Sequence, residues 1–529
     1  MPRAYPRKTC QRVRGDEIES PLCRFKVGTQ SSRDPAHVAF VSQPRNYWLQ
    51  ATEAMFATAL LLVFLGARDL PLVDLPQHAL QLANWLRIDA HASGVDALEL
   101  NFRTPYLLAY PIARALAQLL PVLVALKLTF WASITLQAFT LRKLCERLGH
   151  DPWLGLLGFP LGLGYSFCFG FVAFCAALPV AYLGFLFAAQ HRDAPSWRSG
   201  CRLAGTLALL LVAHGVALAF LLSVLGPFML FGSGRWWQRV LPFAAPPLLG
   251  LVWLVPGNSS TRLGGDLWQL EPQRLIEIPG QLVGIGAADP VATLLGLLLI
   301  AALGWSVGPR RSLPFLLPLL TAVGGYALFP TMFHGAGPLG PRFSSYFVPA
   351  ALLAFAPPPD EPDRTTTARR AFVLLVAASV PLAFALRLPQ FNRELSAFHA
   401  LTERLPPGLA VRPLVFERAS HAYPGIPALL HVPAYYSLEK GGSAGYSFAM
   451  YSISVVRYRP GFVVKMGGGM EWAPERFDAA RETDDYDYFI VESQSDRGAT
   501  LFPGPEPAAV LEQHVGNWWG YRRSRPSSG

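Results

Sequence analysis

The sequence contains a series of long apolar runs, which constrain its fold more than any other feature. Only 15% of the 529 residues are charged and 52% are hydrophobic, whereas a soluble domain usually carries about 25% charged residues. About 20 consecutive apolar residues can cross a bilayer as a helix. The sequence therefore predicts a polytopic α-helical membrane protein with soluble parts, and it excludes a disordered chain, a fibrous repeat and an ordinary cytosolic enzyme.

The basic residues are distributed unevenly along the chain. Residues 1–47 carry nine Lys or Arg against four Asp or Glu, and residues 389–529 carry fourteen against fifteen. Because Lys and Arg in short loops stay on the cytoplasmic side, residues 1–47 are expected to form a basic cytoplasmic segment. The net charge of +10 then indicates how a multi-pass protein is oriented in the inner (plasma) membrane. It is not taken to indicate a nucleic-acid partner, and none is predicted.

The apolar runs predict a transmembrane domain over residues 48–388 with about eleven spans. The basic loops all lie on the cytoplasmic side only if segment 105–119 lies in the outer interface without crossing the membrane. Residues 67–104 are then the first outer loop. In the alternative, 105–119 is a short span and every later loop changes side. Breaks are expected at Ser166–Gly170 and at His214-Gly215. The predicted spans are 48–66, 122–141, 152–168, 170–190, 203–214, 216–232, 238–256, 290–307, 313–329, 343–357 and 370–388.

Residues 389–529 alternate between helix and strand patterns and predict an extracytoplasmic α/β domain. About 140 residues are enough for one small core, and an odd number of spans places this domain outside. None of the six cysteines lies in it, so no disulfide framework is predicted. Helices are expected at 392–405 and 508–514, and strands at 409–416, 452–458, 486–491 and 518–521.

A stripe of polar residues follows the first span. If a helix starts at Asp74, then Asp74, Gln77, His78 and Gln81 share one face of it. We expect this helix to lie along the membrane surface, with Asp74 as a general base and His78 as a second proton acceptor or a hydrogen-bonding partner. Gln77 and the preceding Asp69 are candidate substrate-binding residues. In the alternative, Asp74 and Gln77 only initiate the helix through an N-cap and a capping box.

A second candidate segment, 333–349, is an outer loop that leads into a span. Arg342 lies at the N-terminal end of the expected helix, where the helix dipole already favours negative charge. An anion such as a lipid phosphate would be held there by the guanidinium and free N–H groups; alternatively, Arg342 extends toward the lipid headgroups. His334 in this loop and His214 at the broken turn are further substrate-binding candidates, each with a structural alternative.

Several functional motifs are absent from the sequence. It contains no P-loop, no G-x-G-x-x-G, no G-x-S-x-G and no paired C-x-x-C. No His, Cys, Asp or Glu spacing predicts a metal site. Nucleotide-driven transport and serine-hydrolase chemistry therefore lack support.

Three segments carry a resemblance to a known family. Thr104–Leu108 is similar to a P-P-L-Y-Y helix start, Leu141–Gly149 closes the following span, and Pro341–Leu353 is similar to an R-Y-x-x-P-x-x-P helix start. In the last segment Phe343 replaces the tyrosine and Tyr346 the first proline. Together with the acidic first outer loop, these segments resemble the GT-C superfamily of integral-membrane glycosyltransferases, which includes the protein O-mannosyltransferases and the lipid A aminoarabinose transferase.

The resemblance implies an inverting transfer from a polyprenyl-phosphate sugar to a glycan, lipid or protein acceptor in the cell envelope. It assigns the catalytic acid of the first outer loop to Asp74, or else to Asp69, and a lipid-phosphate contact to Arg342. A requirement for a divalent metal stays open. The competing hypothesis is a non-enzymatic membrane protein, a transporter or an envelope-assembly scaffold, whose outer domain binds a partner.

Overall fold

The computed structural model describes residues 47–254, 274–284, 289–330, 337–359, 362–462 and 466–524. Residues Trp48–Gly529 form one compact unit. The predicted basic segment 1–47 lies outside the described residues except for Tyr47.

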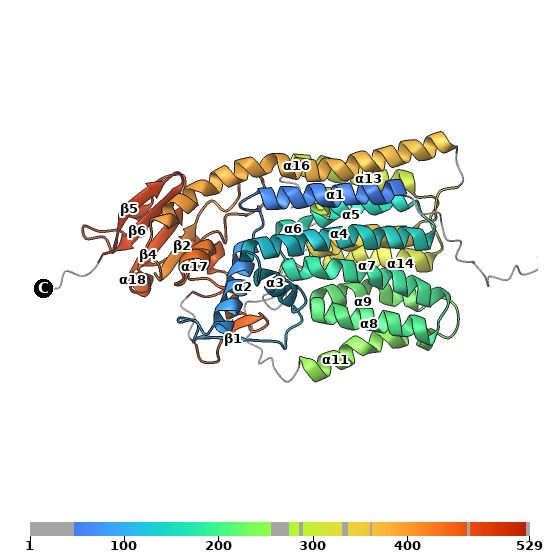
Figure 1. The fold of residues 1–529 in the computed structure, drawn as a ribbon, viewed down its shortest axis with the longest axis horizontal. Helices are drawn as coiled ribbons and strands as arrows, with labels where there is room; N and C mark the ends of the chain where they lie inside the picture. Colours follow the sequence, from blue (N-terminus) through green and yellow to red (C-terminus); the bar gives the residue numbers. More distant parts are fainter. Residues whose placement is uncertain are drawn as a thin grey trace, which may run out of the picture. The chain divides into compact units, whose positions relative to one another are not determined.

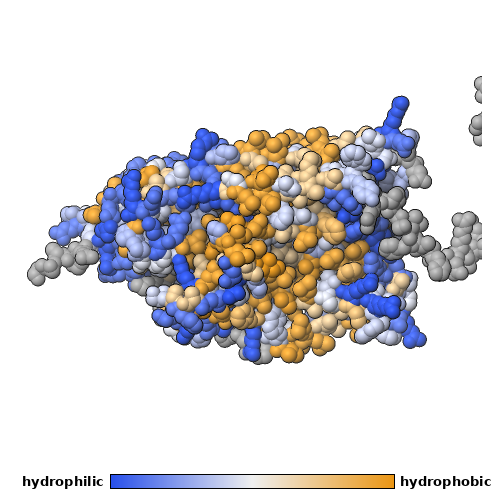
Figure 2. All heavy atoms as spheres, viewed as in Figure 1, coloured by the Kyte–Doolittle hydropathy of each residue, from blue (hydrophilic) through white to orange (hydrophobic). Residues whose placement is uncertain are grey.

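A bundle of apolar helices makes up most of this unit (Figure 1). Four helices are long and apolar enough to cross a membrane, namely α1 (Tyr47–Gly66), α4 (Val122–Leu148), α7 (Val172–Asp193) and α16 (Asp363–Glu403). Hydrophobic residues form a band between two hydrophilic ends in Figure 2. The helical membrane fold agrees with the prediction, but only four helices meet this criterion among the described residues, so the predicted count of eleven spans is not confirmed. Shorter helices complete the bundle: α8 (Trp197–Ala213), α9 (Gly215–Met229), α12 (Arg274–Val283), α13 (Pro290–Ser306) and α14 (Leu313–Leu328).

Three of the predicted spans are series of short helical pieces. Proline lies at or near the start of several of these pieces, where it favours a new helix over the continuation of the previous one. The predicted span 152–168 consists of η1 (Pro152–Leu157), α5 (Gly158–Gly162) and α6 (Tyr165–Cys168). The predicted spans 238–256 and 343–357 consist of α10 (Trp236–Val240), η2 (Leu241–Ala244) and α11 (Ala245–Trp253), and of η4 (Gly340–Tyr346) and α15 (Phe347–Ala354).

Both predicted breaks are present, and both contact the loop that follows α1. Residues 169–171 separate α6 from α7, and His214 separates α8 from α9. The N–H of Asp74 donates to the carbonyl of Phe169, and the N–H of Gly215 donates to that of Pro105. Within this loop, α3 (Ala109–Ala117) has nine residues and is about 14 Å long, which is too short to cross a hydrocarbon core of about 30 Å.

Helix α16 extends from the bundle into the C-terminal region as one helix of 41 residues. The predicted span 370–388 and the predicted helix 392–405 are therefore one element, and the predicted domain boundary at residue 389 falls inside it. The C-terminal sheet has the order β2-β4-β6-β5, with β2 parallel to β4 and the other pairs antiparallel. Its strands are β2 (Val411–Val415), β4 (Tyr488–Glu492), β5 (Ala509–Val515) and β6 (Trp518–Arg523).

The helix predicted at 508–514 is wrong, because these residues form strand β5. Val515 pairs with Trp518 across a tight turn, in which Gly516 has a positive φ of 59°. Pairing with β6 overrides the helix propensity of Ala, Leu, Glu and Gln in this segment. Short elements complete the region: α17 (Ala434–Lys440), η5 (Phe448–Met450), η6 (Met470–Trp472), η7 (Pro474–Arg476), α18 (Ala479–Glu482), η8 (Thr483–Asp485) and α19 (Gly498–Leu501).

The first outer loop and the C-terminal region form one layer at the end of the bundle (Figure 1). Strand β1 (Leu98–Leu100) of the loop pairs with β3 (Val456–Tyr458) in an antiparallel sheet. Helix α2 (Leu75–Asp89) packs against α17, and all its residues from 75 to 85 are buried. The expectation that this helix lies on the membrane surface is therefore wrong, because the C-terminal region covers its polar face.

Close packing of α5 on α4 makes a testable prediction about stability. A Cβ atom on Gly158 would lie 2.3 Å from the Cα of Ala138, whereas one on Gly205 in α8 would meet no atom within 4 Å. Gly158→Ala should therefore destabilise the purified protein by about 1–3 kcal/mol. Gly205→Ala should leave it unchanged or stabilise it by about 0.5–1 kcal/mol. Thermal unfolding in detergent measures both, and equal melting temperatures for the two variants would contradict the packing.

Candidate active site

The turn between α6 and α7 forms the base of the candidate site. The N–H groups of Val73 and Asp74 donate to the carbonyls of Cys168 and Phe169 at 3.2 and 3.0 Å. Gly170 follows with a φ of 80°, and a Cβ atom there would lie 2.9 Å from the backbone nitrogen of Asp74. A left-handed conformation and close backbone approach both require glycine. The local sequence therefore fixes the position of Asp74 against the bundle.

The carboxylate of Asp74 has one engaged oxygen and one open oxygen. Asp74 occupies the N-cap position of α2, but its side chain makes no cap hydrogen bond, so the capping alternative is wrong. Its Oδ1 lies 3.4 Å from Nε2 of His431, whose ring stacks on Tyr446 with centroids 5.1 Å apart. Among the described residues Oδ2 has no hydrogen-bond partner. The side chain is 13% exposed, so it can face a reagent while staying largely shielded from water.

His78 joins α2 to α3. Its Nδ1 lies 2.6 Å from the hydroxyl of Tyr110. Burial lowers the pKa of His78 to about 4, although the charge of Asp74 opposes this shift. A neutral imidazole bound to Tyr110 through Nδ1 holds its neighbours in place. This geometry favours a positioning residue and disfavours the predicted second proton acceptor.

The two glutamines of the polar stripe bind the backbone of the C-terminal region. Gln77 donates to the carbonyl of Tyr446 and accepts from the N–H of Phe448, both at 3.2 Å. Gln81 accepts from the N–H of Val456 at 3.0 Å. These bonds use the amide of Gln77, which was predicted to bind substrate, and they place Tyr446 beside His431.

Asp69, the second predicted acid of the loop, is closed off. Its carboxylate accepts from Nε2 of His399 at 2.9 Å, and its side chain is 2% exposed. Its backbone exchanges two hydrogen bonds of 3.0 Å with the side chain of Asn392. Asp69 therefore attaches the loop to α16, and its geometry does not support the predicted substrate contact.

Arg342 lies in η4 with its guanidinium against the turn that positions Asp74. Its centre is 3.7 Å from the ring centroid of Phe171, and Nε and Nη2 donate to the carbonyls of Pro338 and Gly337 at 2.9 Å. Arg342 is 7% exposed, so the alternative in which it extends to the lipid headgroups is wrong. Nη1 has no hydrogen bond, and no carboxylate lies within ion-pair distance, among the described residues.

The charges of Asp74 and Arg342 are close enough to interact. Both residues are also attached to the turn at 169–171, Asp74 through a hydrogen bond and Arg342 through its contact with Phe171. Two residues far apart in the sequence therefore meet at one place, with an open carboxylate oxygen and an open guanidinium nitrogen.

The remaining two predicted residues do not add to this pair. Nδ1 of His214 accepts from the N–H of Ala217 at 3.3 Å and caps α9, and its ring contacts Tyr106 and Phe174 edge-on. These contacts satisfy His214 structurally. His334 lies outside the described residues.

Sequence reasoning missed two residues of the site, both from the C-terminal region. One is His431, and the other is Glu471, which is 8% exposed and has an Oε2 without a partner among the described residues. Burial raises the pKa of Glu471, and the charge of Asp74 raises it further. The only local signal for Glu471 was the glycine run at 467–469 before it. We call Asp74, His78, Arg342, His431 and Glu471 the Asp74 cluster.

The residues described in the structure contain no group of three His, Cys, Asp or Glu side chains arranged to hold a metal ion. The Asp74 cluster instead combines acidic groups with a guanidinium. Such a set can remove a proton and bind an anion side by side.

The fold of this chain is similar to that of solved membrane-protein structures. Two crystal structures of ArnT from Cupriavidus metallidurans are similar to this chain at 11% sequence identity. The one bound to undecaprenyl phosphate has a TM-score of 0.53 and covers 92% of this chain and 100% of ArnT. The apo structure has a TM-score of 0.54 and covers 90% and 97%. At this identity the likeness establishes the fold.

A third match is weaker. The cryo-EM structure of arabinofuranosyltransferase AftD from Mycobacteria has a TM-score of 0.45 and 16% identity, and covers 90% of this chain but 40% of AftD. No protein-family model and no curated protein matches the sequence.

Neutral, buried His78 predicts a pH dependence of stability. The pKa of His78 is about 4 in the folded chain, against an ordinary value of 6.5. Between these two pH values, His78 is protonated in the unfolded chain and neutral in the folded chain. Stability from His78 is therefore present above pH 6.5 and is lost as the pH falls toward 4, by at most about 3 kcal/mol.

We expect His78→Gln to lose part of this dependence, as measured by the melting temperature at about pH 7 and about pH 5. His421→Gln is the matched control, because His421 is exposed. If the melting temperature falls by the same amount on acidification in His78→Gln and in the wild type, His78 does not cause the pH dependence.

Proposed function

We propose that this protein is a GT-C-type glycosyltransferase that moves a sugar from a polyprenyl-phosphate donor to an envelope acceptor. The observation that carries the proposal is the Asp74 and Arg342 pair. The two residues share one buried turn, and each keeps one polar atom free among the described residues. The fold shared with ArnT supports the same class of reaction.

Asp74 acts as the general base in this proposal. Its free Oδ2 accepts the proton of an acceptor hydroxyl or amine, while His431 holds Oδ1 in place. The acceptor oxygen or nitrogen forms a bond to the anomeric carbon, and the bond from that carbon to the donor phosphate oxygen breaks. The electron pair leaves with the lipid phosphate, and attack from the opposite face inverts the anomeric centre.

Arg342 binds the phosphate of the donor in this proposal. Two carbonyls and the ring of Phe171 fix the guanidinium, so it is already oriented before an anion arrives. A preoriented cation stabilises the charge that develops on the departing phosphate. ArnT, which has a similar fold, was crystallised with undecaprenyl phosphate bound, so this lipid is a suitable probe here.

We place the reaction on the outer side of the membrane, with the N-terminus in the cytoplasm. The ends of α4 and α7, the start of α16 and the loop before α14 meet at the opposite end of the bundle from the Asp74 cluster. They are joined there by the pairs Arg147–Asp193 and Arg370–Asp151 and by the bond from Arg311 to Leu148. We call this the basic end. Basic residues at membrane ends mark the cytoplasmic side.

Two isosteric substitutions separate a base from a neighbouring acid. Asp74→Asn should lower transfer about 100- to 10,000-fold, because an amide cannot accept the proton. Glu471→Gln should keep most of the activity, because burial and the charge of Asp74 already favour the protonated, neutral form of Glu471. The measurement compares envelope glycans by mass spectrometry in cells that carry each variant or lack the protein.

A protein with wild-type thermal stability and glycan profile after Asp74→Asn would contradict the role of Asp74. Loss of the glycan in both variants with unchanged stability would assign Glu471 a charged role instead. No glycan difference between cells with and without the wild-type protein would favour the non-enzymatic alternative.

Binding of undecaprenyl phosphate tests Arg342 separately from catalysis. Arg342→Gln should weaken binding of this lipid to the purified protein by at least tenfold, because a charge-assisted hydrogen bond is lost. Arg418→Gln is the control, because Arg418 is a cation of the C-terminal region that donates to a backbone carbonyl. If the wild type and Arg342→Gln bind undecaprenyl phosphate with equal affinity, Arg342 does not bind the phosphate.

A further inference from the structure

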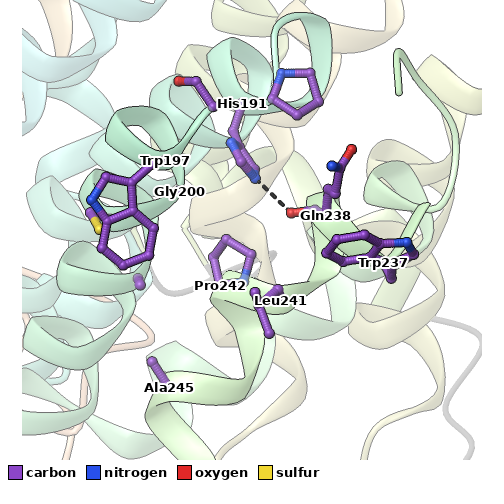
Figure 3. A pocket seen from close by; sticks show the side chains of 12 residues that line it. His191, Trp197, Gly200, Trp237, Gln238, Leu241, Pro242 and Ala245 are labelled. Carbon is purple, nitrogen blue, oxygen red and sulfur yellow. Dashed lines mark hydrogen bonds between the residues drawn. The ribbon is translucent and has the colours of Figure 1, made fainter. Parts of the chain in front are cut away.

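A pocket of about 370 Å³ lies at the basic end, far from the Asp74 cluster (Figure 3). It is formed where the start of α8 faces α10, η2 and the start of α11. Helix α8 has 17 residues and is about 25 Å long, and its other end meets His214. The pocket and His214 are therefore at opposite ends of one helix. The lining residues are His191, Pro195, Ser196, Trp197, Gly200, Cys201, Ala204, Trp237, Gln238, Leu241, Pro242 and Ala245.

The lining is almost entirely apolar. In Figure 3 the rings of Trp197 and Trp237 lie on opposite sides of the pocket, with Pro242 between them. His191 is the one ionisable nitrogen group in the lining, and both its nitrogens are already engaged, with Ser199 Oγ at 2.7 Å and the carbonyl of Gln238 at 3.0 Å. The walls therefore offer apolar surface to an occupant and few polar atoms that seek a partner.

Three arginines are close neighbours, along the chain, of residues that line the pocket. On α8, Trp197, Gly200, Cys201 and Ala204 line it at helical spacing, and Arg198 and Arg202 lie on the adjacent stripe. Arg235 precedes α10 on the other side. All three arginines are exposed, and none pairs with an acidic side chain among the described residues. An occupant with a negative head and an apolar body would match this arrangement.

Tryptophans place the pocket at the level of a membrane surface. Trp197 is 82% exposed, Trp236 62% and Trp237 45%. Exposed tryptophans gather where the hydrocarbon core meets the headgroups. Basic pockets between helices at the cytoplasmic face bind anionic headgroups. The exposed tryptophans beside the pocket are those expected near the headgroups of a bilayer.

We propose that this pocket binds one anionic phospholipid of the leaflet at the basic end. An acyl chain fills the space between Trp197 and Trp237, and the phosphate lies among Arg198, Arg202 and Arg235 near the start of α8. The bound lipid fixes α8 against α10 and α11. This site is independent of the proposed transferase reaction and requires no catalytic residue.

Native mass spectrometry of the full-length protein tests the proposal with two probes, phosphatidylglycerol and phosphatidylcholine. The wild type should retain one phosphatidylglycerol, and prefer it to phosphatidylcholine by about tenfold or more, because each arginine near an anionic headgroup adds affinity. Arg198→Gln with Arg202→Gln should reduce this preference by about tenfold. The matched control is Arg310→Gln with Arg364→Gln, which removes two exposed charges elsewhere at the basic end and should leave the preference unchanged.

A second variant tests the apolar half of the site. Ala204→Trp fills the pocket and should abolish the one-to-one adduct of either lipid, without weakening binding of undecaprenyl phosphate at the other end. If the wild type retains no stoichiometric lipid, the site does not exist. If it retains both probes equally, or if the arginine pair and its control behave alike, the anionic selectivity is wrong.

Discussion

The hydrogen bonds between the loop after α1 and the turn that breaks α6 from α7 are the constraint on which the site depends. A helix that breaks within a bundle frees backbone groups, and in an apolar surrounding other parts of the protein must satisfy them. Here the N–H groups of Val73 and Asp74 donate hydrogen bonds to the carbonyls of Cys168 and Phe169. These two bonds satisfy carbonyl groups at the break and hold Asp74 against it. The same turn supplies Phe171, on which the guanidinium of Arg342 packs.

The C-terminal region completes this arrangement because the chain ties it down at three places. Helix α16 enters the region without interruption, β3 pairs with β1 of the outer loop, and Gln77 and Gln81 bind the backbone between them. These ties bring His431 to Asp74 and bury Glu471 nearby. The region is thus a structural part of the candidate site, and a separately folding appendage would not hold His431 at this distance.

The sequence was sufficient for the features that depend on local chemistry. Hydropathy predicted the helical bundle, and glycine and polar residues predicted the breaks at Ser166–Gly170 and His214. Features that depend on distant partners were not predictable. In the sequence, the face of α2 that carries Gln77 and His78 looks like a reactive polar stripe. In the structure, the C-terminal region covers this face. For β5, the decisive partner is β6, and local propensity pointed to a helix.

A comparison of two buried arginines shows why Arg342 is the one suited to a ligand. Arg239, at the basic end, donates through all three of its nitrogens to carbonyls at the end of α9, from Met229 and Leu230 to Gly234. Each of its nitrogens has a carbonyl partner, so it serves as a helix cap. Arg342 donates through only two nitrogens, and an aromatic ring supports its face. Burying a cation with an unused donor is unfavourable unless an anion completes it, and the interacting Asp74 does not reach ion-pair distance. The unused donor of Arg342 is therefore the feature on which the proposed phosphate contact rests, whereas Arg239 offers no such nitrogen.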